Sequence, residues 1–61
     1  MTDYEITDAM LNFGGSFVRS LALAYRAGDA VNQHKIKDAF SEVWVEYARL
    51  AQLKAEKART A

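Results

Sequence analysis

The sequence contains no cysteine, no proline and only one histidine, His34. Disulfides and thiolate-bound metals are therefore excluded, and a single imidazole cannot form a multi-histidine metal site. His34 stands four residues before Asp38, a spacing typical of a local surface pair on a helix rather than of a catalytic base. The serines have no recognisable base partner in the sequence. We therefore predict no catalytic residue, no metal site and no cofactor, and expect that the protein is not an enzyme.

An excess of charge of one sign and a long apolar run are lacking too. Eight basic and eight acidic residues give a formal net charge of zero, which argues against a nucleic-acid-binding protein. No apolar run approaches the roughly 18–20 residues of a membrane span. The residues near the N-terminus are acidic, whereas a signal peptide begins with a basic segment, so we expect no signal peptide here. We expect a cytoplasmic protein that contacts no membrane.

Apolar residues instead recur at helical spacing in the first half of the chain. One stripe comprises Ile6, Met10, Phe13, Phe17, Leu21 and Tyr25. A second stripe beside it comprises Leu11, Val18 and Ala22. Thr2 and Glu5 have the spacing of a capping box, and Gly28 is placed to end the helix in the left-handed conformation. The pattern predicts a helix over about 3–27.

The second half of the chain predicts another helix, over about 32–58. Its apolar stripe comprises Ile36, Phe40, Val43, Tyr47, Leu50 and Ala51. We favour Asn32 as its N-cap, with Asp29 almost as suitable. A possible break near Ser41 would divide off a short helix at 33–40, and the basic tail at 54–61 is expected to fray.

These elements predict a single all-α domain over residues 1–61. The short connection favours an antiparallel helical hairpin. An isolated hairpin of this size buries little apolar surface, and the chain has no disulfide, so we expect a homodimer or a higher helical-bundle oligomer. The residues expected at the subunit interface are Phe13, Phe17, Leu21, Leu23, Phe40 and Val45.

Gly14 and Gly15 stand inside the first predicted helix, where each costs about 1 kcal/mol relative to alanine. The favoured interpretation is a crossing point at which the missing side chains let a neighbouring helix approach closely. The alternative is a break, after which the backbone N–H groups of Ser16 and Phe17 open a new helix and could hold a phosphate.

Several polar and aromatic residues are candidates for ligand binding. Arg19 and Arg26 are seven positions apart and share a helix face, and arginine suits phosphate geometry. Aromatic residues with polar tips belong either to the core and subunit interface or to a platform for a stacked base. The candidate ligand-binding residues are Asn12, Gly14, Gly15, Ser16, Arg19, Tyr25, Arg26, Trp44 and Tyr47.

Two segments resemble a group of small phage- and prophage-encoded proteins of undefined function. They are Phe13-Gly-Gly-Ser-Phe-Val and Ala39-Phe-Ser-Glu-Val-Trp-Val-Glu-Tyr. The likeness covers about residues 10–51 and includes Ala24, Tyr25, Asp29 and Asn32. Ser41 stands where the pattern has proline, and Tyr25 stands where tryptophan is common.

The resemblance implies a phage protein that counters host defence in the cytoplasm of an infected bacterium. Our first hypothesis is a non-enzymatic protein that sequesters a nucleotide-derived signalling molecule between its subunits. The alternative is an inhibitor or adaptor that blocks a host protein through an apolar helical face including Leu23 and Val45. A third class is a structural or regulatory phage component, and the neutral charge argues against its DNA-associated form.

Overall fold

The computed structural model describes the backbone of residues 2–60 and the side chains of residues 2–58. These residues form four helices: α1 (Asp3–Phe13), α2 (Ser16–Ala27), α3 (Ala30–Ala39) and α4 (Ser41–Thr60). The predicted all-α class is confirmed. The tail expected to fray belongs to α4 as far as Thr60, while residue 61 lies outside the described residues.

Helix α1 begins with the capping box that the sequence predicts. The Thr2 hydroxyl accepts the backbone N–H of Glu5 at 3.2 Å, and the Glu5 carboxylate accepts the backbone N–H of Thr2 at 3.1 Å. Acidic residues in the first turn also suit the positive end of the helix dipole. The middle of the helix buries Ile6, Thr7, Ala9 and Met10, so α1 is fixed both at its start and along one face.

The continuous helix predicted over 3–27 is wrong, because the chain leaves the helical conformation at Gly14 and Gly15. Gly14 has φ −81° and ψ 156°, and Gly15 has φ −76° and ψ −173°, both extended. The last bond of α1 joins the Gly14 N–H to the Met10 carbonyl at 2.9 Å. Two adjacent glycines cost a continuous helix about 2 kcal/mol relative to alanine, and the break lets α2 turn back to pack against α1.

The connection between α2 and α3 differs from the prediction in two details. Gly28 has φ −82°, so it does not adopt the left-handed conformation. The left-handed conformation is not needed at the end of α2, because the Tyr25 carbonyl accepts both the Gly28 N–H and the Gln33 side-chain amide. Asp29, not Asn32, is the N-cap of α3, and its carboxylate accepts the Asn32 N–H at 2.9 Å.

The possible break near Ser41 is confirmed. Phe40, with φ −119° and ψ 39°, separates α3 from α4, so the helix predicted over 32–58 is divided in two. The interruption is a single residue long. The Phe40 N–H still closes α3 on the Ile36 carbonyl, and the Phe40 carbonyl accepts the N–H groups of Val43 and Trp44 to start α4.

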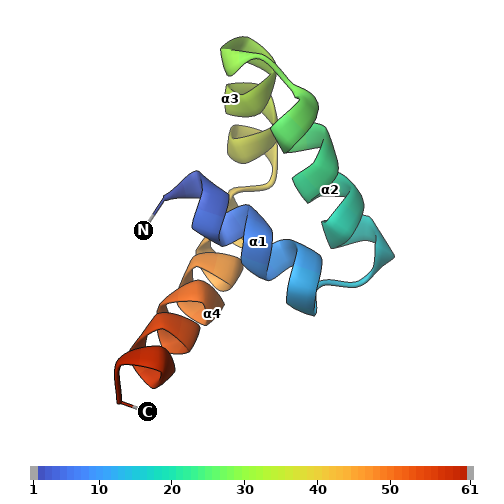
Figure 1. The fold of residues 1–61 in the computed structure, drawn as a ribbon. Coiled ribbons are helices and arrows are strands. Elements are labelled where there is room, and N and C mark those ends of the chain that lie inside the picture. Colours follow the sequence, from blue (N-terminus) through green and yellow to red (C-terminus); the bar gives the residue numbers. More distant parts are fainter. Residues whose placement is uncertain (1, 61) are drawn as a thin grey trace.

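Helices α2 and α4 both pack against α1, and α3 packs against α2 and α4 (Figure 1). Helix α1 lies across α4, α2 rises from the end of α1, and α3 returns beside α2 before joining α4. The buried apolar residues are Ile6, Ala9, Met10, Ala22, Tyr25, Trp44, Tyr47 and Ala51. They come from α1, α2 and α4, so the core lies where these three helices meet.

The molecule measures 37 × 21 × 19 Å, and the C-terminal half of α4 extends away from the other helices (Figure 1). Across residues 2–60, none of the helices combines the length and the hydrophobicity that crossing a membrane would require.

Candidate functional site

The aromatic residues proposed as a stacking platform lie in the core. Tyr25 is 8 % exposed, Trp44 4 % and Tyr47 9 %. The rings of Tyr25 and Trp44 pack against each other with centroids 5.0 Å apart. Their flat faces are therefore covered by protein, and a base could stack on them only if the core opened.

The two arginines of the predicted ligand face have different surroundings. The Arg26 guanidinium lies 4.4 Å above the centre of the Tyr4 ring. Its Nε donates to the Thr7 hydroxyl at 3.0 Å, and one terminal nitrogen donates to the Tyr4 carbonyl at 3.2 Å. Arg26 thus fastens α2 to the first turn of α1, although it remains exposed, as Arg19 does.

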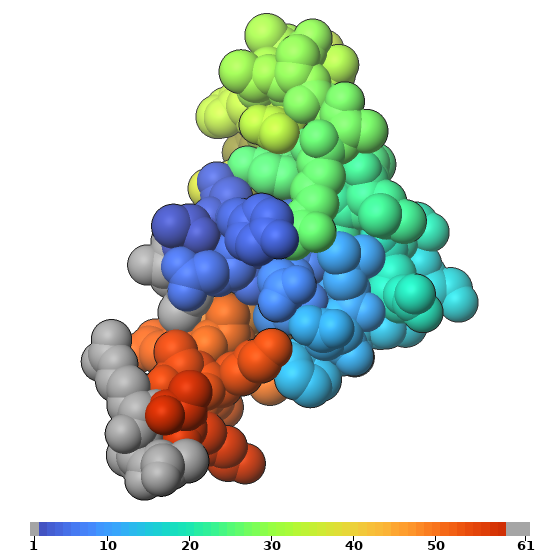
Figure 2. Space-filling view, in the orientation of Figure 1, coloured from blue at the N-terminus to red at the C-terminus, as the bar shows by residue number. Residues whose placement is uncertain are grey.

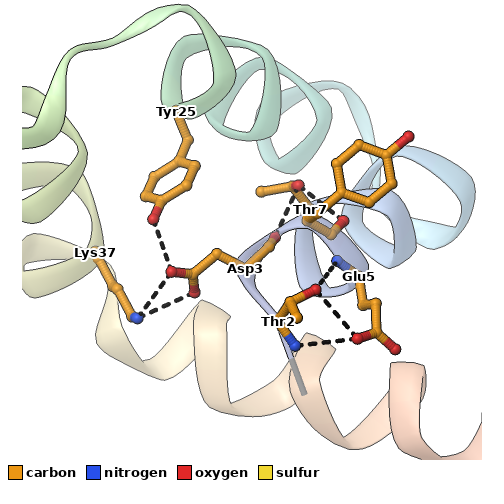
Figure 3. Close-up of polar contacts among 7 residues, drawn as sticks. Thr2, Asp3, Glu5, Thr7, Tyr25 and Lys37 are labelled. Carbon is orange, nitrogen blue, oxygen red and sulfur yellow. Dashed lines mark hydrogen bonds and ion pairs between the residues drawn. The ribbon is translucent and has the colours of Figure 1, made fainter.

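The N-terminal end of α1 is held by a second polar cluster, centred on the Asp3 carboxylate (Figure 3). Lys37 of α3 donates to its two oxygens at 3.0 and 3.3 Å, and the Tyr25 hydroxyl donates to Oδ2 at 2.9 Å. The hydrogen bond from Lys37 is the main reason that the pKa of Asp3 lies below its usual value, and the bond from Tyr25 acts in the same direction. Burial, aided by the neighbouring carboxylate, raises the pKa of Tyr25.

The indole N–H of Trp44 contributes weakly to this cluster. It lowers the pKa of Asp3 slightly, yet its buried nitrogen makes no hydrogen bond of ordinary length and angle among the described residues. Lys37 and Tyr25 hold the carboxylate through direct hydrogen bonds. The polar groups of this cluster are hydrogen-bonded to one another across α1, α2 and α3. The cluster therefore acts as a fastening between these helices.

The Gly14-Gly15 break opens α2 at Ser16, as the alternative interpretation of the sequence has it. Gly15 is the N-cap and supplies no side-chain hydrogen bond to the first turn. The two glycines differ in their surroundings. A Cβ on Gly14 would lie 2.5 Å from the Met10 carbonyl oxygen and 2.6 Å from Val18 Cγ1, whereas a Cβ on Gly15 would meet nothing within 4 Å. Close approach therefore explains Gly14 only.

An open apolar groove of about 630 Å³ lies between the end of α1 and the C-terminal half of α4. Figure 2 shows this part of α4 (orange to red) projecting from the body of the molecule below the end of α1 (light blue). Phe13, 57 % exposed, forms one wall, and Leu50 and Leu53, the latter 51 % exposed, form the other. The charged residues that complete the lining are Lys54, Glu56 and Lys57.

A smaller hollow of about 240 Å³ lies between the first half of α1 and α4. Tyr4, Asp8 and Lys54 are among its lining residues. The ammonium of Lys54 lies 3.9 Å from the Asp8 carboxylate, so an ion pair crosses this hollow. Asp8 also accepts the side-chain amide of Asn12 at 3.4 Å. Polar groups are thus already paired here, and the larger groove is the better binding surface.

The residues expected at an interface do not form one surface. Phe13 lines the groove, while Leu23 and Val45 are exposed on α2 and α4 outside its lining. Phe17 is exposed but packs edge-on against the half-buried ring of Phe40, with centroids 5.7 Å apart. Leu21 is half-buried against the core.

Leu50 and Leu53 were missed as candidate site residues. The sequence placed Leu50 in the apolar stripe of the second predicted helix, as a core position. Ala51 is the last residue of α4 in the buried core. Leu53 lies beyond it and stays half exposed, whereas Leu50 is partly buried against the core.

Among residues 2–58, no group of three or more histidine and acidic side chains could hold a metal ion. No protein-family model, curated protein or solved structure matches this chain. The groove between α1 and α4 is therefore the candidate site on its geometry alone, because it offers apolar walls and a charged rim.

Proposed function

We propose that the protein is a non-enzymatic binding protein that holds an amphipathic helix of a partner protein in the groove between α1 and α4. The observation that supports this is the groove itself, in which Phe13 and Leu53 remain more than half exposed on opposite walls. Apolar helical faces commonly dock in grooves of this kind. Covering the exposed half of Leu53 would contribute about 0.8–1.5 kcal/mol.

In the phage setting that the resemblance implies, the partner would be a host defence protein, which the bound chain blocks or links to another protein. This is the alternative from the sequence, with the apolar face moved from Leu23 and Val45 to the groove. The competing proposal is sequestration of a nucleotide-derived signal between subunits. It receives less support, because its aromatic residues are buried and Arg26 is engaged with α1.

The test uses Leu53→Asp, with Val45→Asp as the matched control. Both positions are exposed apolar residues on α4, and only Leu53 lines the groove. The tagged full chain would be expressed in bacteria, and the proteins that crosslink to it would be identified. Each identified protein would then be purified and titrated against the chain by calorimetry. We expect one partner whose affinity is unchanged by Val45→Asp and falls about 10- to 100-fold with Leu53→Asp. A partner retained equally by both variants would contradict the groove.

A panel of cyclic and ADP-ribose-type nucleotides in a thermal-shift assay tests the competing proposal. Arg19→Ala is the informative variant, because Arg19 is exposed and its loss should leave the fold intact. Arg26→Ala is ambiguous, since Arg26 also holds α1. Nucleotide stabilisation that disappears with Arg19→Ala would favour sequestration over protein binding.

A further inference from the structure

The face of α4 beside the groove carries charges of opposite sign at its two ends. Glu46, Leu50, Leu53 and Lys57 follow one another at spacings of four, three and four positions, so they share one face of the helix. Leu50, Leu53 and Lys57 line the groove, and Glu46 is exposed. The stripe therefore has an acidic end, an apolar centre and a basic end.

We propose that α4 of a second copy of this chain occupies the groove, and that the two copies form a two-fold symmetric dimer. The inference rests on one part of the proposed function, that the groove holds an amphipathic helix. It assigns a second copy of the chain as an occupant that competes with the host protein for the groove. A two-fold interface requires a surface complementary to itself. Two copies of the Glu-Leu-Leu-Lys stripe complement each other when the two helices run antiparallel.

The register follows from the spacing. Two α4 helices that pack antiparallel about a point midway between Leu50 and Leu53 place Leu50 against Leu53 of the partner subunit. The same register places Glu46 opposite Lys57 of the partner subunit. Symmetry repeats each contact, giving two leucine pairs between two pairs of opposite charges. Phe13 forms the remaining wall of each groove and covers the side of the leucine pairs.

The exposed surface is large for a single chain of this size. The accessible area is 4404 Å², about 450 Å² more than the roughly 3,950 Å² expected for a folded monomer of 6.8 kDa. The radius of gyration is 11.6 Å, against about 10.5 Å for a compact domain of this length. Both excesses fit the projecting half of α4. A stable interface covers about 800 Å² per subunit, roughly a fifth of this surface.

Stability and charge favour the same occupant. The buried apolar core of the described residues has eight members, three of which are alanines, and the chain has no disulfide to add support. Small domains of this kind commonly gain stability by oligomerising. The formal net charge of zero removes the repulsion that would keep two copies apart.

Sedimentation equilibrium over about 1 µM to 1 mM protein tests the dimer. We expect the unmodified chain to approach twice its 6.8 kDa mass. Leu53→Asp should raise the dimer dissociation constant at least about 100-fold, because each dimer receives two buried charges. Val45→Asp, outside the groove lining, should remain dimeric. Circular dichroism should show equal helix content in both variants, which separates dissociation from unfolding.

Charge reversal tests the register independently. Glu46→Lys and Lys57→Glu should each weaken the dimer about tenfold or more, because like charges then face each other across the interface. The double variant restores opposite charges and should return the dissociation constant to within about threefold of its original value. A double variant as weak as the single ones would overturn the antiparallel register.

The unmodified chain sedimenting at 6.8 kDa throughout the series would overturn the dimer. So would a dimer that survives Leu53→Asp and dissociates with Val45→Asp, because its interface would then lie on another face. A monomer that still binds a partner through Leu53 refutes this inference and leaves the proposed function standing. A Leu53-dependent dimer that binds no other protein supports this inference and refutes the binding of a host protein.

Discussion

Replacing Gly14 with alanine tests how the break between α1 and α2 is built. The new Cβ would lie 2.5 Å from the Met10 carbonyl oxygen and 2.6 Å from Val18 Cγ1, where ordinary contacts begin at 3.4 Å. Rotating the Val18 side chain would not relieve the clash, because Val18 Cβ itself would be 2.8 Å away. The Met10 carbonyl cannot withdraw either without loss of the bond that closes α1.

The expected magnitude follows from two opposing effects. Overpacking of this kind costs about 1–3 kcal/mol. Alanine also restricts the unfolded chain, which stabilises the folded state by about 0.4–1 kcal/mol when the conformation is compatible. The extended φ and ψ of Gly14 are open to alanine, so both effects apply. We expect the free energy of unfolding to fall by about 1–2 kcal/mol and the melting temperature by about 5–15 °C.

Gly15→Ala is the matched control, since its Cβ would meet nothing within 4 Å. The entropic gain is offset by the weaker N-cap propensity of alanine, so stability should stay within about 0.5 kcal/mol of the original. Thermal and urea unfolding followed by circular dichroism, at one fixed protein concentration, measures both variants. Equal stability of the Gly14 and Gly15 variants would refute the close-approach explanation.

Two further predictions concern the fastenings of α1. Asp3→Asn should lower stability by up to about 1 kcal/mol at neutral pH, a small effect because the ion pair with Lys37 is partly exposed. Folding lowers the pKa of Asp3 below 3.8, so the stabilisation from its carboxylate is present above pH 3.8 and is lost as the pH falls through the folded-state pKa. Urea unfolding should therefore show the stabilities of the original protein and Asp3→Asn converge in acid. Arg26→Ala should cost about 1–2 kcal/mol by removing its bonds to Thr7 and the Tyr4 carbonyl, while exposed Arg19→Ala should stay within about 0.5 kcal/mol. Equal losses in thermal unfolding would contradict the assignment of Arg26 as a fastening.

The helical class and several local signals could be predicted because they depend on neighbouring residues. The Thr2–Glu5 capping box, the start of α1 and the possible break near Ser41 all agree with the structure. The N-cap of α3 was misassigned between two close alternatives, Asp29 and Asn32, because either side chain can accept a hydrogen bond from a nearby backbone N–H.

The candidate ligand face could not be evaluated in the same way. Spacing placed Arg19 and Arg26 on one face of a helix, but it carried no information on which neighbouring helix would cover part of that face. Helix α1 accepts two hydrogen bonds from Arg26, while both arginines stay exposed. The aromatic residues were open to either a core or a ligand interpretation, and packing assigned Tyr25 and Trp44 to the core.

The sequence by itself determined that this chain is helical, where its first helix begins, and that it lacks disulfides and a cysteine- or multi-histidine-based metal site. These properties depend on residue type and local spacing. Tertiary structure alone decided that Gly14 and Gly15 divide the first helix, since a break is favourable only when the separated halves gain packing. It also decided that Phe13 and Leu53 form the two walls of a groove. These residues are 40 positions apart, and only the crossing of α1 over α4 brings them together.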